Sequence, residues 1–163
     1  MVFPINHKYR RQTEGTSLTG GKGMGYVYAD IELTNEDDVA LNSRGMLPDN
    51  QVRRVSTKAL VDSGAYDLII NQEIQEQLKL RVLGKRAVRL ADERVLEVDI
   101  VGPVEVRFET AATTVRALVI PDTEQVLLGA IPLEGLDVII DPVRERLLVN
   151  PPETTSHYVK RAA

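Results

Sequence analysis

One short segment, KALVDSGAYDLII from Lys58 to Ile70, constrains the fold most. It places a single acid, Asp62, with three small residues between two apolar runs that both have the character of buried strands. An ionised carboxylate is costly to bury unless it is hydrogen-bonded or paired. Asp62 is therefore either a surface turn residue, since Asp, Ser and Gly are common in turns between strands, or a functional acid.

Alternation of apolar and polar residues in the rest of the chain predicts a mainly β domain. Residues 26–33 alternate cleanly, and residues 86–100 have the pattern of a hairpin with a polar tip at 91–94. Short helices are expected at 71–78, capped by Asn71, and at 131–136, whereas the acidic stretch 34–50 is typical of a long surface loop. We expect a single domain with a closed, or nearly closed, antiparallel β structure and one or two short helices. Further strands are expected at 52–61, 68–70, 104–108, 113–120, 138–140 and 146–149.

Composition is consistent with one domain and argues against several functions. The chain has 163 residues, 43% of them hydrophobic, which is enough for one core. A net charge of -4, scattered basic residues and the lack of Trp argue against a nucleic-acid partner. No stretch has the length and apolarity of a signal peptide or a membrane span, and there is no Cys, so we expect a cytoplasmic protein without a membrane partner. Both histidines, His7 and His157, lie in the expected tails, so we expect no metal and no other cofactor.

The residues around Asp62 carry a family resemblance. Leu60-Val61, then Asp62-Ser63-Gly64-Ala65, then a short apolar strand and, far downstream, Leu127-Leu128-Gly129 together resemble the aspartic proteases of the retropepsin type. The stretches ERVLEVDIVGPVEVRF and LLGAIPLEGLDVIIDP are especially similar to the bacterial, single-domain group usually called clan AA aspartic proteases. At average residue usage, the motif around Asp62 would arise by chance on the order of once in several hundred chains of this length.

This resemblance implies a domain organisation. It covers residues 24–150, which would form a retropepsin-like closed β-barrel. Residues 1–23 would be a flexible N-terminal arm, and residues 151–163 a C-terminal tail.

The resemblance also implies roles for individual residues. Asp62 would be the catalytic carboxylate, Ser63 would donate its hydroxyl to the neighbouring loop, and Gly64 would let the backbone approach substrate closely. Substrate would be bound by Ala65 and by the tip of a flap that contains Ala91, Asp92 and Glu93. Two residues depart from the family pattern: Glu93 occupies a position where Gly is common, and Tyr66 one where smaller polar residues are usual.

Peptide hydrolysis of this kind needs two carboxylates that hold one proton between them. The chain has a single D-[ST]-G motif, and Asp122-Thr123-Glu124 lacks the glycine, so the expected active unit is a homodimer in which Asp62 is contributed twice. The expected function is an aspartic endopeptidase that acts on a peptide or protein substrate. The alternative is a binding or scaffold module that keeps the retropepsin fold with weak or no catalysis.

Overall fold

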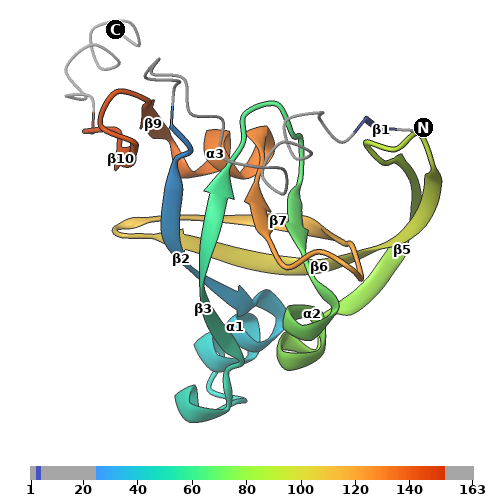
Figure 1. Cartoon of the computed structure of the whole chain (residues 1–163). Helices are drawn as coiled ribbons and strands as arrows, with labels where there is room; N and C mark the ends of the chain where they lie inside the picture. The colour runs from blue at the N-terminus through green and yellow to red at the C-terminus, as the bar shows by residue number, and fades with distance from the viewer. Residues whose placement is uncertain (1–2, 5–24, 153–163) are drawn as a thin grey trace, which may run out of the picture.

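The computed structural model describes residues 3–4 and 25–152 of the chain (Figure 1). The arm expected at 1–23 therefore lies outside the described residues, apart from a two-residue strand, β1 (Phe3–Pro4), which pairs with a strand of the expected flap. The tail expected at 151–163 lies outside them from residue 153 onward.

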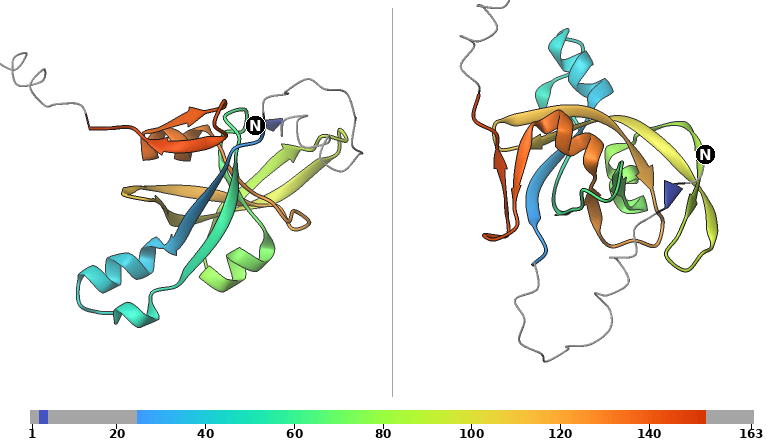
Figure 2. Two further views of the ribbon diagram at one scale, coloured as in Figure 1. Left: turned by 60° about the vertical axis from the view of Figure 1, so that its left-hand side comes forward. Right: turned by 90° about the horizontal axis from the view of Figure 1, so that it is seen from above.

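Six strands close into a barrel. Their order is β6-β2-β3-β8-β4-β7, and β7 pairs back onto β6 to complete the ring (Figures 1 and 2). The long strand β6 also pairs with β5 outside the ring, and β9 and β10 form a separate antiparallel hairpin. The expectation of a mainly β, closed barrel is confirmed. The strands are β2 (Tyr28–Asn35), β3 (Arg54–Val61), β4 (Leu68–Ile70), β5 (Arg81–Arg89), β6 (Val95–Phe108), β7 (Ala111–Val119), β8 (Val126–Leu128), β9 (Val138–Asp141) and β10 (Arg146–Val149).

The barrel is mixed, with two parallel pairings in what was expected to be an antiparallel structure. Consecutive strands β3 and β4 do not pair with each other, because β8 inserts between them, parallel to β3 and antiparallel to β4. Strand β4 in turn pairs in parallel with β7. Local alternation identifies a strand but says nothing about which distant strand lies beside it.

Residues 25–152 contain three α-helices, whereas one or two were expected. Helix α2 (Gln72–Leu78) begins as predicted, with the Asn71 side chain accepting a hydrogen bond from the Ile74 amide at 2.9 Å. Helix α3 (Ala130–Leu136) follows β8. The prediction of a surface loop at 34–50 is wrong, because this stretch holds α1 (Glu36–Ser43) and a 3-10 turn, η2 (Asp49–Gln51).

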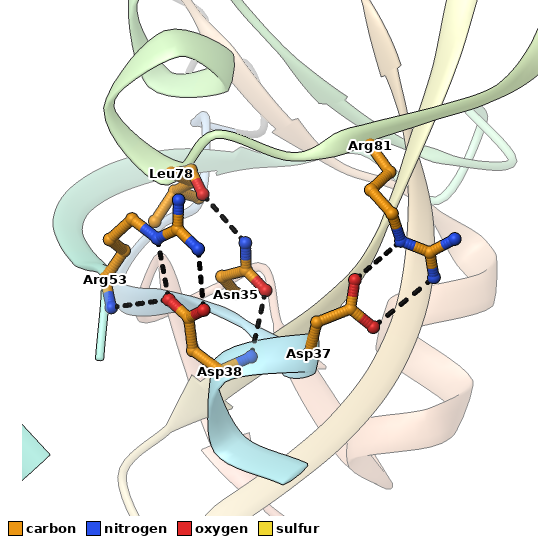
Figure 3. Close-up of polar contacts among 6 residues, drawn as sticks. All are labelled: Asn35, Asp37, Asp38, Arg53, Leu78 and Arg81. Atoms are coloured by element: carbon orange, nitrogen blue, oxygen red, sulfur yellow. Dashed lines mark hydrogen bonds and ion pairs between the residues drawn. The ribbon is translucent and has the colours of Figure 1, made fainter. Parts of the chain in front are cut away.

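Polar contacts, not an apolar face, hold α1 in place (Figure 3). Asn35 accepts from the Asp38 amide at 3.1 Å and donates its own amide to the last carbonyl of α2 at 2.9 Å. The buried Asp38 carboxylate accepts from the Arg53 guanidinium at 2.6 and 2.7 Å, and these hydrogen bonds lower the pKa of Asp38. Asp37 pairs with Arg81 at 2.6 Å. Helix α1 is thus tied to the beginning of β3, the end of α2 and the beginning of β5.

The barrel wall separates two hydrophobic clusters. Successive side chains of a strand point to opposite faces, so β3, β4 and β8 each contribute to the barrel core on one face and to a second cluster on the other. The second cluster includes residues of the β5–β6 hairpin, and we call it the flap cluster. It consists of Leu60, Ile69, Val88, Val98, Ile100, Leu118 and Leu127.

Candidate active site

The loop at residues 62–67, which connects β3 to β4, crosses the end of β8. The Asp62 amide donates to the Leu128 carbonyl at 3.1 Å, and the first two amides of α3 donate to the carbonyls of Ala65 and Tyr66 at 2.7 and 2.9 Å. The loop therefore rests on residues 128–131.

Gly129 is required by this crossing. A Cβ atom at this position would overlap the carbonyl oxygen of Asp67 and would lie only 2.9 Å from the carbonyl oxygen of Ala65. Both obstacles are backbone atoms, which no change of side-chain rotamer can move. The glycine thus allows two chain segments far apart in sequence to meet beneath Asp62.

The Asp62 side chain is half-buried in a tight turn. Its Oδ1 atom accepts from the Gly64 amide at 2.9 Å, and its carbonyl accepts from the Ala65 amide at 3.1 Å. Ser63 and Gly64 are exposed, whereas Ala65 is buried. Over residues 25–152 no Lys or Arg side chain forms an ion pair with Asp62. The turn therefore holds a carboxylate in a fixed place, and no cation within residues 25–152 neutralises it.

Strands β5 and β6 form the expected hairpin, with residues 91–94 at its tip. The Leu90 amide donates to the Arg94 carbonyl at 2.8 Å, and the Glu93 amide donates to the Leu90 carbonyl at 3.0 Å. Glu93 has a φ of 70°, the left-handed conformation that glycine tolerates best. The turn thus has a backbone suited to glycine even though glutamate occupies the position.

The other side chains of the tip lie at the surface. Asp92 and Glu93 are exposed, and Ala91 is half-buried. Hydrogen bonds from Arg94 lower the pKa of Asp92, and Glu93 pairs with Arg89 at 3.0 Å.

The stem of this hairpin packs against the strands that lead to the Asp62 loop. Val88 of β5 and Val98 of β6 share the flap cluster with Leu60, which is two residues before Asp62, and with Leu127, two residues before Gly129. Figure 1 shows the hairpin tip and the loop after β3 on the same side of the barrel. The predicted catalytic and substrate-binding residues thus belong to two elements joined by one apolar cluster.

The sequence reading missed one polar contact at this site. Asp67, at the end of the loop, pairs with Arg86 of β5, with 2.9 Å between Oδ2 and Nη1. The position of Asp67, directly before the apolar run of β4, is a sign in the sequence that this acid needs a partner. Its partner, Arg86, could not be identified because it lies 19 residues away. Tyr66 is 55% exposed beside it.

Neither a metal centre nor a membrane helix is found in the described part of the chain. No three His, Cys, Asp or Glu side chains there are grouped so that they could hold a metal ion. No helix there is long and apolar enough to cross a membrane.

Solved structures include many with a similar fold, whereas a search of curated proteins finds no match. One similar structure is the retroviral protease-like domain of Ddi1 from Leishmania major. It aligns with a TM-score of 0.48 and 19% sequence identity, over 77% of this chain and 90% of that one.

A family model described as "gag-polyprotein putative aspartyl protease" matches residues 49–134, more than half of the chain. The match includes the Asp62 loop, the β5–β6 hairpin and Gly129. The chain belongs to this family of gag-polyprotein-type aspartyl proteases.

Proposed function

We propose that the protein is a homodimeric aspartic endopeptidase in which each subunit supplies one catalytic Asp62, and that it belongs to the bacterial single-domain group. The observation that carries this proposal is the Asp62 turn. A half-buried carboxylate without a cationic partner in the described residues is fixed by the Gly64 amide, on a loop braced by residues 128–131. It lies inside the region that matches the aspartyl protease family.

The chemistry needs two such acids close together. Two like charges a few ångströms apart cannot both ionise readily, so the pair holds one proton. The ionised Asp62 takes a proton from water, whose oxygen attacks the peptide carbonyl carbon, while the protonated Asp62 donates to the carbonyl oxygen. The intermediate then collapses, the C–N bond breaks and the leaving amine takes a proton. We expect a bell-shaped dependence of kcat/KM on pH, with both limbs belonging to the pair.

The substrate in this proposal is an extended peptide between the Asp62 loop and the β5–β6 hairpin, which acts as the flap. Ala65 and the tip residues Ala91, Asp92 and Glu93 are the proposed substrate contacts. The exposed tip and the apolar stem suit this role, since the tip can move while the stem stays packed.

A peptide-library cleavage assay tests the proposal, with a pepstatin-like transition-state mimic as inhibitor. We expect Asp62→Asn to abolish inhibitor-sensitive cleavage while preserving the fold. Asp122→Asn is the matched control, because Asp122 is exposed and lies outside the motif, and it should leave activity unchanged. Full activity in Asp62→Asn would refute the proposal. Peptide binding by the wild type without any cleavage would instead favour the binding or scaffold module.

A further inference from the structure

We propose that the Asp67–Arg86 ion pair is the fixed point about which the flap moves, and we call this pair the fulcrum. In this account the pair fixes the flap stem to the loop that carries Asp62, so that the flap opens by bending beyond Arg86. Asp67 and Arg86 would then be positioning residues for substrate binding. The kinetic part of this inference rests on the proposed function, whereas the mechanical part does not.

The pair differs in burial from the other ion pairs of the flap. The side chains of Arg86 and Asp67 are only 16% and 11% exposed, whereas those of Arg89 and Glu93 are 50% and 69% exposed. Exposed pairs contribute little to holding two elements together. A largely buried pair is costly to break and has a defined direction, so it can specify how two elements are placed.

Asp67 lies on a closely packed part of the site. Its carbonyl oxygen is in close approach to Gly129, and the preceding carbonyl, that of Tyr66, accepts from the Ile131 amide at 2.9 Å. The next residue, Leu68, begins the fully buried strand β4. Asp67 is thus held from both sides by the barrel, which makes it a suitable anchor.

Arg86 lies on the face of the flap that meets the barrel. Residues two apart on a strand share a face, and Val88, two residues after Arg86, is fully buried in the flap cluster. Beyond Val88 the packing weakens, because Leu90 is only partly buried and Asp92 is exposed. The segment that can bend, from Val88 to Asp92 at the tip, is four residues long, or roughly 13 Å. The Asp67–Arg86 pair thus holds the stem two residues before this segment begins.

A second ion pair on the same strand provides a matched control. Arg81 at the beginning of β5 pairs with Asp37 of α1, but these side chains are 61% and 42% exposed. The register of β5 against β6 shifts between Val82 and Gly84, so Arg81 is separated from the flap stem by an irregularity in the strand. Loss of this pair should therefore not reach the flap.

Loss of the fulcrum should alter substrate binding more than the chemical step. When the stem is released, a smaller fraction of molecules holds the flap in the substrate-competent position, and the apparent affinity falls by that fraction. We expect Asp67→Ala and Arg86→Ala each to raise KM on the order of tenfold, with a smaller change in kcat. The double variant should be no worse than either single one. Asp37→Ala and Arg81→Ala should leave KM unchanged.

A distance measurement tests the same inference without catalysis. The chain has no Cys, so spin labels can be attached at Val95→Cys at the base of the tip and Ile139→Cys on strand β9, which are 56% and 46% exposed. Labelled protein diluted with unlabelled protein should give one narrow distance distribution. Asp67→Ala should broaden this distribution, and Asp37→Ala should not. If the wild type cleaves no peptide, the proposed function fails but this distance still decides on the fulcrum.

A third variant separates positioning from stability. Asp67→Leu/Arg86→Met replaces the pair by an apolar contact, which often preserves the free energy of unfolding but lacks a defined direction. We expect wild-type stability with a raised KM and a broadened distance. Recovery of both the wild-type KM and the narrow distance would show that the pair is merely structural and would overturn the inference. An unchanged distance distribution in folded Asp67→Ala would overturn it as well.

Discussion

At the scale of single residues, the site depends on a position that has no side chain. Gly129 lies where the Asp62 loop passes over the end of β8, and the atoms closest to it are backbone atoms of residues 65–67. Two backbone segments at this distance can adapt to a methyl group only if one of them shifts. Such a shift would move the loop that carries Asp62.

We therefore expect Gly129→Ala to lower the free energy of unfolding by about 2 kcal/mol and to reduce proteolytic activity. Urea denaturation measures the first effect and peptide cleavage the second. Gly84→Ala is the matched control, since a Cβ at Gly84 would meet nothing within 4 Å. Equal stability of the two variants would show that the loop is not as tightly packed on Gly129 as described.

Glu36 at the beginning of α1 gives a residue-scale prediction that depends on pH. Its Oε2 atom is buried and has no hydrogen-bond partner among the described residues. Burial, followed by the charges of Glu105 and Asp37, raises the pKa of Glu36 above 4.5, and a hydrogen bond with Thr114 opposes this shift. Because the folded state holds the proton more tightly than the unfolded state, stability falls as pH rises from 4.5 through the raised pKa.

Glu36→Gln should therefore be more stable than the wild type at neutral pH, by about 1 kcal/mol. The gain should disappear in acid, where Glu36 is protonated in both states. Thermal unfolding over a pH series measures it, and Glu124→Gln at an exposed position is the control. A gain that stays constant at every pH would exclude titration of Glu36 as the cause.

At the scale of elements, the sequence predicts those helices that show a local cap and an apolar face. Helix α2 was predicted because Asn71 caps it and Ile74 and Leu78 share a buried face. Helix α1 was missed because Asp38 is its only buried residue, so it lacks an apolar period. The cap Asn35 followed by three acids was the available signal, since such residues favour a helix N-terminus.

The candidate site also has a part that the sequence predicts and a part that it does not. The Asp62 turn could be predicted because its residues are adjacent in the sequence. Insertion of β8 between β3 and β4, and the pairing of Asp67 with Arg86, could not, because they depend on which distant segments become neighbours. Turn propensity is a local property, whereas ion pairing across elements follows from the completed barrel.

The flap tip gives the prediction that belongs to this scale. Glu93→Gly keeps the turn, because glycine tolerates a φ of 70°, but it frees the backbone and removes the pair with Arg89. We expect a changed KM or kcat with the fold intact. Glu93→Ala is the control, since it removes the pair while keeping a constrained backbone. If neither variant altered the kinetics for several peptides, residues 91–94 would not cover the substrate.

At the scale of the whole molecule, the barrel holds one Asp62 at its surface. The barrel core lies on one face of β3, β4 and β8, and the flap cluster lies on the other, so the loop at 62–67 is fixed between two packed layers. One chain supplies one D-[ST]-G motif. In our proposal the catalytic site is therefore complete only when two copies meet and their Asp62 side chains share a proton.

Subunit mixing tests this central proposal most directly. Wild-type protein is mixed with an excess of Asp62→Asn protein, exchange of subunits is confirmed, and cleavage is compared with that of the same wild-type concentration alone. Each mixed dimer would hold one carboxylate, so we predict that activity falls well below that of the wild type alone. Dilution should lower specific activity in the same way once dimers dissociate. Undiminished activity despite confirmed exchange, or constant specific activity in a demonstrated monomer, would contradict the two-copy site.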